Sequence, residues 1–207
     1  MKRGLFEVTQ TPMTDYQGLE QYIIDQLKKR LPAVLTYHSY NHVMDVLDAA
    51  MRIAAFEKIN GEDLKLLRIG ALFHDSGFMN TTVNHEEEGC RIVKDKLPEF
   101  GFNEEQIEKV CGMILSTKIP QSPKNRLEEI LCDADLDYLG RDDFYSIGHQ
   151  LFSEMKIYHN VKTELEWNKI QLNFLKSHAY HTSWSFKFRE ERKQEHLNEI
   201  IKLVENY

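Results

Sequence analysis

The residues best suited to do chemistry in this chain are polar side chains on otherwise apolar helix faces. His42 and His74 each continue such a face, and Asp135 does so in a later segment. Asp75 directly follows His74 at the end of an apolar run. A buried carboxylate is costly without a cation or good hydrogen-bond donors, and imidazole nitrogens and carboxylate oxygens are ligands for divalent transition metals. One such residue is more often a hydrogen-bonded core residue than a ligand, but three on separate helices favour a shared metal ion.

Helices must position these residues, since helical periodicity recurs along the chain while strand signals are weak. We expect His42 within a helix over residues 36–57 and His74 at the end of a helix that begins near Asn60. Asp135 falls in a later helix with a clear apolar face. Further helices are expected over residues 14–31, 85–96, 103–118, 142–156, 163–176 and from 183 onward, the first of them opened by a capping box at 14–17.

Length and composition support a soluble helical protein. The 207 residues suit one all-α domain, a single-domain bundle of roughly eight to ten helices, with a metal-binding core at about 35–140 and a C-terminal helical extension at about 141–207. The formal charge of -7 argues against a partner that is a nucleic acid polymer. Cys90, Cys111 and Cys132 form no paired motif, so we expect buried, reduced thiols. No signal peptide or membrane-length segment is found, which predicts a cytoplasmic protein without a membrane partner.

The order of the polar residues resembles that of the HD-domain superfamily of metal-dependent phosphohydrolases. The matching segments are Asn-His42-Val-Met-Asp-Val, Leu-Phe-His74-Asp75-Ser-Gly and Leu-Cys-Asp-Ala-Asp135-Leu-Asp-Tyr-Leu-Gly, within residues 35–140. The resemblance implies a helical HD fold in which these four residues bind the first metal ion and Asp75 serves the catalysis. The family's last ligand is the Asp preceded by Ala, which selects Asp135 over Asp133. Asp133 is then expected to face solvent or to support the ligands from outside.

Two further histidines are assigned roles through the resemblance. His38 and His42 keep the His-x3-His spacing of class I cyclic nucleotide phosphodiesterases, in which the first histidine protonates the leaving oxygen, so His38 is a candidate general acid. The alternative is an exposed histidine at a helix start. His85 stands where HD proteins often supply a ligand to a second metal, although it could simply begin a helix. Binuclear members often carry another histidine near Thr117, and this chain has none there.

The resemblance implies hydrolysis of a phosphoester, of the nucleotide or cyclic nucleotide class, by metal-activated water. The mixed nitrogen and oxygen ligands suit one or two ions of Fe, Mn, Ni, Co or Zn. Lys118 and Arg141 are candidate contacts for a small phosphorylated substrate, against the alternative of solvated surface charges. Two other functions stay open: an HD-fold iron oxygenase, and a non-catalytic regulatory module that binds a ligand. An oligomer is possible.

Overall fold

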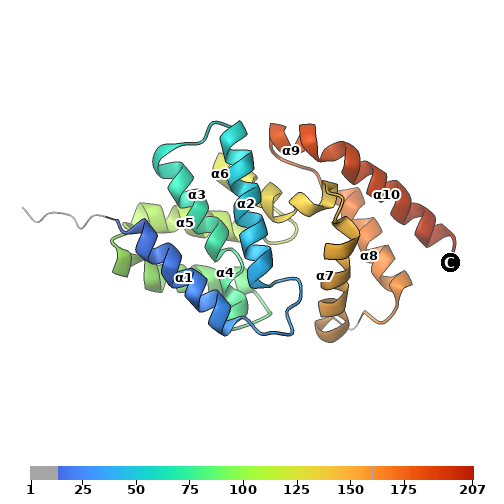
Figure 1. The fold of residues 1–207 in the computed structure, drawn as a ribbon, viewed down its shortest axis with the longest axis horizontal. Helices are drawn as coiled ribbons and strands as arrows, with labels where there is room; N and C mark the ends of the chain where they lie inside the picture. The colour runs from blue at the N-terminus through green and yellow to red at the C-terminus, as the bar shows by residue number, and fades with distance from the viewer. Residues whose placement is uncertain (1–13, 160) are drawn as a thin grey trace, which may run out of the picture.

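The computed structural model describes residues 14–159 and 161–207 and shows an all-α fold (Figure 1). Within these residues there are ten α-helices, three 3-10 helices and no strand, as the periodicity predicts. The helices are α1 (Tyr16–Arg30), α2 (Tyr40–Phe56), α3 (Gly61–Phe73), α4 (His85–Lys96), α5 (Glu104–Ser116), α6 (Arg126–Asp135), α7 (Phe144–Tyr158), α8 (Glu164–Ser177), α9 (Ser183–Phe188) and α10 (Glu190–Glu205). The 3-10 helices are η1 (Ser76–Met79), η2 (Leu97–Phe100) and η3 (Asp137–Gly140).

The helices form two groups that meet at α2 and α6. In Figure 1, α1 to α6 lie on one side and α7 to α10 on the other. The first group packs α2 against α3 and α6, and α5 against α3 and α4. Its core includes Ile53, Leu67 and Leu131, all with no exposed surface. A second, smaller core joins η3, α7, α8 and α10 to Tyr37, which precedes α2. Residues from the two groups therefore face each other around the start of α2.

Local capping signals fix several helix ends. The Asn103 side chain accepts from the backbone N–H of Gln106, whose own side chain accepts in return, so α5 begins where the sequence predicts. The capping box expected at Thr14 is wrong, because Asp15 caps α1 by accepting from the N–H of Gly18 at 2.8 Å. The helix expected from residue 183 onward is also wrong in part, since it divides at Arg189 into α9 and α10.

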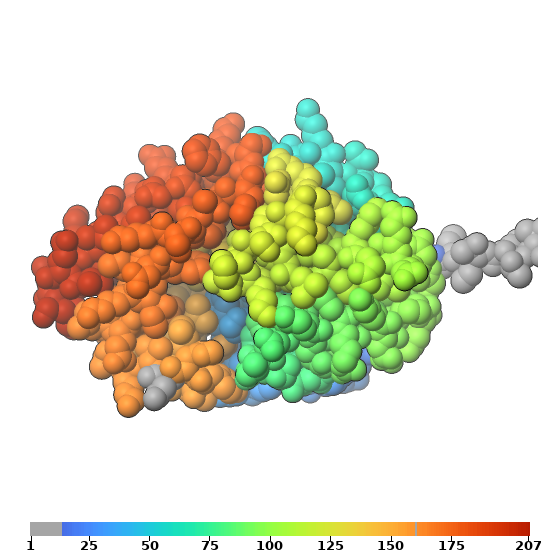
Figure 2. Space-filling view, turned by 180° about the vertical axis from the view of Figure 1, so that it is seen from behind, coloured from blue at the N-terminus to red at the C-terminus, as the bar shows by residue number. Residues whose placement is uncertain are grey.

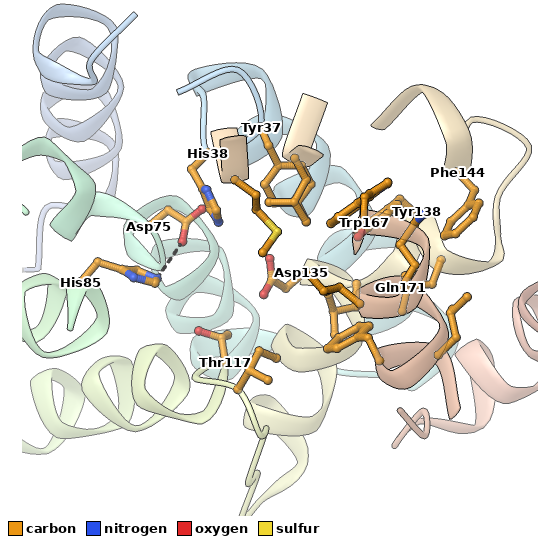
Figure 3. Close-up of a pocket in the computed structure, with 18 of the residues that line it drawn as sticks. Tyr37, His38, Asp75, His85, Thr117, Asp135, Tyr138, Phe144, Trp167 and Gln171 are labelled. Atoms are coloured by element: carbon orange, nitrogen blue, oxygen red, sulfur yellow. Dashed lines mark ion pairs between the residues drawn. The ribbon is translucent and has the colours of Figure 1, made fainter. Parts of the chain in front are cut away.

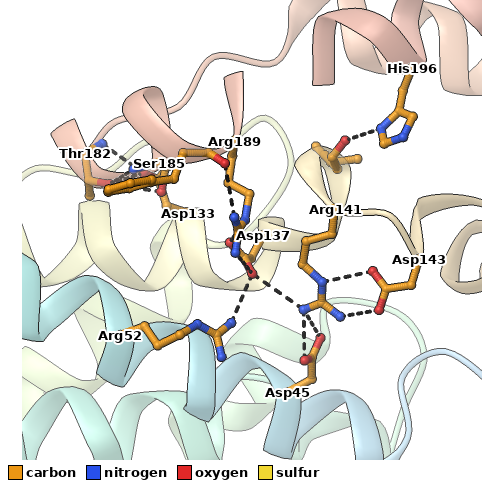
Figure 4. Close-up of polar contacts among 12 residues, drawn as sticks. Asp45, Arg52, Asp133, Asp137, Arg141, Asp143, Thr182, Ser185, Arg189 and His196 are labelled. Carbon is orange, nitrogen blue, oxygen red and sulfur yellow. Dashed lines mark hydrogen bonds and ion pairs between the residues drawn. The ribbon is translucent and has the colours of Figure 1, made fainter. Parts of the chain in front are cut away.

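The second half of the chain is tied to α6 and η3 by buried carboxylates (Figure 4). Asp133 accepts hydrogen bonds from the backbone N–H groups of His181 and Thr182, at 2.9 and 2.8 Å, and from the Thr182 hydroxyl at 2.7 Å. It has no exposed surface, so the expectation that it might face solvent is wrong. Asp137 is likewise buried and accepts from the Arg189 guanidinium at 2.7 Å. The helix ends that carry these carboxylates are thereby held rigidly.

Two other sequence expectations concern side-chain burial and membrane spans. The three cysteines are free and buried, as predicted. Over the part of the chain that the structure describes, no helix has both the length and the apolar character that a bilayer crossing requires.

Candidate metal centre

Four predicted ligands converge where the ends of three helices meet. His42 lies in the first turn of α2, His74 follows the last residue of α3, Asp75 precedes η1, and Asp135 is the last residue of α6. Nε2 of His42 lies 3.1 Å from Oδ1 of Asp135 and 3.4 Å from Nε2 of His74. Oδ2 of Asp75 lies 3.3 Å from Nε2 of His74 and 3.5 Å from Nε2 of His42. Bonds of about 2.0–2.2 Å to one ion place neighbouring ligand atoms roughly 3.0–3.5 Å apart, so the spacing fits a shared metal ion.

The hydrogen bonds around the cluster leave its inner atoms free to bind a cation. Nδ1 of His74 lies 2.7 Å from the carbonyl oxygen of Ala71 and donates to it, which directs Nε2 at the carboxylates. Oδ2 of Asp75 is buried and has no hydrogen-bond partner among the described residues. His42, His74 and Asp135 offer ligand atoms that all lie within 4.8 Å of one another. The residues therefore fit a divalent metal ion.

Electrostatics in the cluster also favour a bound cation. Burial alone would raise the pKa of both carboxyl groups. For Asp75 the adjacent His74 outweighs burial and holds the pKa well below its usual value. For Asp135 the hydrogen bonds from His42 and His74 lower the pKa to about 2. Both groups are thus anionic at neutral pH, and the same carboxylates hold the pKa of His74 well above its usual value, so a divalent ion bound here would take the place of the imidazole proton.

His85 lies beside the cluster, on the other oxygen of Asp75. Its Nε2 is 3.5 Å from Oδ1 of Asp75, the pair marked by a dashed line in Figure 3. The imidazole stacks on the Phe78 ring, with centroids 3.9 Å apart. Glu86, which the sequence interpretation passed over, is buried next to it, with Oε1 3.6 Å from Nε2 of His85. One carboxylate oxygen of Asp75 therefore faces the first ligand set and the other faces His85, which is the arrangement that a bridging carboxylate needs.

His38 lies outside the helix in which it was expected. It precedes Ser39, the N-cap of α2, rather than standing one turn before His42 within that helix. Its Nδ1 is 2.7 Å from Oε2 of Glu154 on α7. The other oxygen, Oε1, accepts from the backbone N–H of Tyr37 and, at 2.9 Å, from that of His38. Burial would lower the pKa of His38, but the hydrogen bond to Glu154 and the charges of Asp75, Glu154 and Asp135 together raise the pKa.

The two predicted phosphate contacts do not line the cavity beside Asp75 and Asp135, although Arg141 lines a separate hollow together with the ligand His42. Nζ of Lys118, whose side chain is 42% exposed, lies 2.5 Å from Oε1 of Glu87. The Arg141 guanidinium is paired with Asp45 at 2.8 Å and with Asp143 at 2.5 Å (Figure 4). Neither cation lines the cavity next to the ligands, and both are neutralised by carboxylates of their own chain.

A cavity of about 200 Å³ opens beside the ligand cluster. Figure 2 shows the molecule hollowed where the orange α7 and α8 region approaches the green residues of α4 and the yellow-green residues after α5. His38, Asp75, His85 and Asp135 line one end, and Trp167 and Phe144 lie toward the other (Figure 3). Thr117 also lines it, near the position at which the family's additional histidine was missing. The lining residues from α7 and α8 carry no sequence signal that distinguishes them from core.

Comparison with known proteins agrees with this geometry. Residues 39–137 match the HD domain family. Among solved structures, Bacillus subtilis YpgQ in complex with ADP is similar over 91% of this chain and 97% of its own, with a TM-score of 0.61 and 21% identity. A predicted HD superfamily hydrolase from an uncultured Thermotogales bacterium is similar over 90% of this chain and 91% of its own, with a TM-score of 0.57 and 22% identity. None of the curated proteins matches the sequence. The family match identifies residues 39–137 as an HD domain, and His42, His74, Asp75 and Asp135 all lie within that segment.

Proposed function

We propose that the protein is a metal-dependent phosphohydrolase that cleaves a phosphoester of the nucleotide class. The observation that carries the proposal is the convergence of four ligand side chains at one end of a cavity that His38 also lines. The YpgQ structure with ADP supports a nucleotide as the substrate class. Residues 141–207 belong to the same functional unit in this proposal, because α7 and α8 line the cavity.

His42, His74, Asp75 and Asp135 would hold the first ion, drawn from Fe, Mn, Ni, Co or Zn, and His85 with Oδ1 of Asp75 would contribute to a second. An ion held there lowers the pKa of a bound water and polarises a phosphoryl oxygen. Asp75 orients the attacking water through its carboxylate. His38 protonates the leaving oxygen from Nε2, while Glu154 holds its Nδ1–H and so fixes the direction of the ring.

The test combines elemental analysis of the purified protein with a panel of phosphoesters in the presence of Mn or Fe. One or two ions per chain and release of phosphate, or of an alcohol from a diester, support the proposal. His42→Ala should lose the metal, whereas His149→Ala, an exposed histidine on α7, should keep it. A protein that binds metal, cleaves no phosphoester and consumes oxygen with substrate would instead be an oxygenase. A protein that retains no transition metal would be a binding module.

A further inference from the structure

The cavity beside the ligand cluster is polar at one end and apolar at the other. The polar end is formed by His38, Asp75, His85, Glu86 and Asp135. The other end, which we name the inner chamber, is lined by Tyr138, Phe144, Met155, Trp167, Phe174 and Leu175. Figure 3 shows the aromatic rings of this end facing the cavity from α7 and α8, opposite the carboxylates. A cavity divided in this way suits a ligand with one charged end and one apolar end.

We propose that the substrate carries a single phosphoryl group joined to a planar, largely apolar ring system, and that the ring lies in the inner chamber. The proposal rests on the phosphohydrolase function proposed above and names its substrate class. It places the phosphoryl group at the ligand cluster and His38. The ring then stacks among the side chains of α8.

The charges around the cavity restrict the number of phosphates. Among the described residues that line it there are three carboxylates, Asp75, Glu86 and Asp135, and no Lys or Arg. Polyphosphate sites are typically built with Lys or Arg beside each additional phosphate. Lys118 is committed to Glu87, and Arg141 to Asp45 and Asp143. A metal ion held by Asp75 and Asp135, together with a protonated His38, would balance one phosphoryl group, whereas a further phosphate would find only Glu86 and no cation among the lining residues.

The shape and chemistry of the inner chamber favour a planar ring. Trp167 and Phe174 offer flat apolar surfaces on which a ring can stack. The inner chamber is part of a cavity of about 200 Å³. Gln171 is the polar residue among the lining side chains of α8, and its Nε2 donates to Oδ1 of Asn168 at 3.2 Å.

Two pairs of substrates test the proposal with one metal-loaded preparation. 1-Naphthylmethyl phosphate should give a kcat/KM at least tenfold above that of glycerol 3-phosphate, because both esters lose a primary alkoxide and only the first has an aromatic ring. AMP should be cleaved faster than ADP or ATP. Equal rates within the first pair, or a preference for ATP in the second, would overturn the proposal.

A variant and a binding measurement separate this proposal from the phosphohydrolase function itself. Phe174→Ala should reduce kcat/KM about tenfold for 1-naphthylmethyl phosphate, so that most of the preference for this ester over glycerol 3-phosphate is lost. Phe188→Ala, an exposed aromatic residue on α9, is the matched control and should change neither. Calorimetric binding of 1-naphthylphosphonate, which cannot be hydrolysed, should weaken in Phe174→Ala. If the phosphonate binds but no ester is cleaved, the phosphohydrolase function is refuted and ring binding in the inner chamber is supported. If esters are cleaved without a preference for the ring, the phosphohydrolase function stands and the ring-binding proposal is refuted.

Discussion

Replacing the Glu154 carboxylate, which is hydrogen-bonded to His38, tests the effect of that one group on the pKa of His38. The Nδ1 to Oε2 distance of 2.7 Å is that of a charge-assisted hydrogen bond. Glu154→Gln keeps an oxygen that can accept from the backbone N–H groups of Tyr37 and His38. It replaces the other oxygen with an amide that donates to Nδ1, so the neutral imidazole is favoured over the imidazolium.

The expected size follows from the value of that bond. A hydrogen bond to a charged group contributes about 1.5–3 kcal/mol, and about 1.4 kcal/mol corresponds to one pKa unit, so the pKa of His38 should fall by roughly one to two units. A general acid works while protonated, and the raised pKa of His38 keeps it protonated to higher pH than a free imidazole. Activity is therefore present below this pKa and lost as pH rises through it. Glu154→Gln should move the alkaline limb of the kcat profile down by about one to two units.

The assay is kcat measured between pH 5 and 9 for the parent protein, Glu154→Gln, His38→Ala and the double variant. His38→Ala should slow turnover roughly 10²–10⁴-fold with the metal retained. The double variant should be no slower than His38→Ala, because Glu154 acts through His38. Glu164→Gln, an exposed glutamate on α8, serves as the control. An unshifted alkaline limb in Glu154→Gln, or a uniform loss at every pH, would refute the reasoning.

Three further predictions concern the ligand cluster and its support. Asp75→Ala should abolish metal retention while circular dichroism shows unchanged helix content; full metal stoichiometry would contradict the proposed ligands. Asp135→Ala should also lose the metal, whereas Asp133→Ala, two residues earlier on α6, should keep it and instead lower the free energy of unfolding by about 1–3 kcal/mol, since three hydrogen bonds are lost. Gly77→Ala should destabilise the fold by about 1–3 kcal/mol in urea unfolding, because a Cβ there would lie 1.9 Å from the carbonyl oxygen of His85. An unchanged unfolding midpoint would show that the start of α4 can move.

The sequence is most informative where the determinants of structure are local. The start of α5 follows from Asn103 and Gln106, three residues apart, and α4 begins at His85 as expected. The ligand positions are similarly readable, because a polar residue on an apolar helix face is visible within a few turns. Their convergence at one metal ion was predicted from the cost of burying three polar residues on separate helices, and the resemblance then assigned the individual ligands.

Interactions between distant segments could not be predicted in the same way. Glu154 lies 116 residues from His38, and periodicity gives no reason to pair a glutamate on α7 with a histidine before α2. For the same reason the sequence left two positions open for Asp133, one of them facing solvent, since its donors at His181 and Thr182 come 48 and 49 residues later. No Gly or Pro marks the break between α9 and α10 at Arg189. In each case the deciding contact forms only when the two halves of the chain pack together.

The inner chamber could not be predicted from the sequence for a second reason, because the same apolar residue types line the wall of a cavity and fill a core. Trp167 and Leu175 are as buried as core side chains, and the sequence interpretation assigned them to the core. Apolar periodicity records that a face avoids water and does not record whether the space opposite is filled.

We therefore propose a division within the chain. The segment that matches the HD family supplies the metal ligands from helix ends fixed by local signals, and α7 and α8 supply the ring-binding wall and the carboxylate that orients His38. Substrate choice can then change through residues 141–207 while the ligand cluster stays as it is.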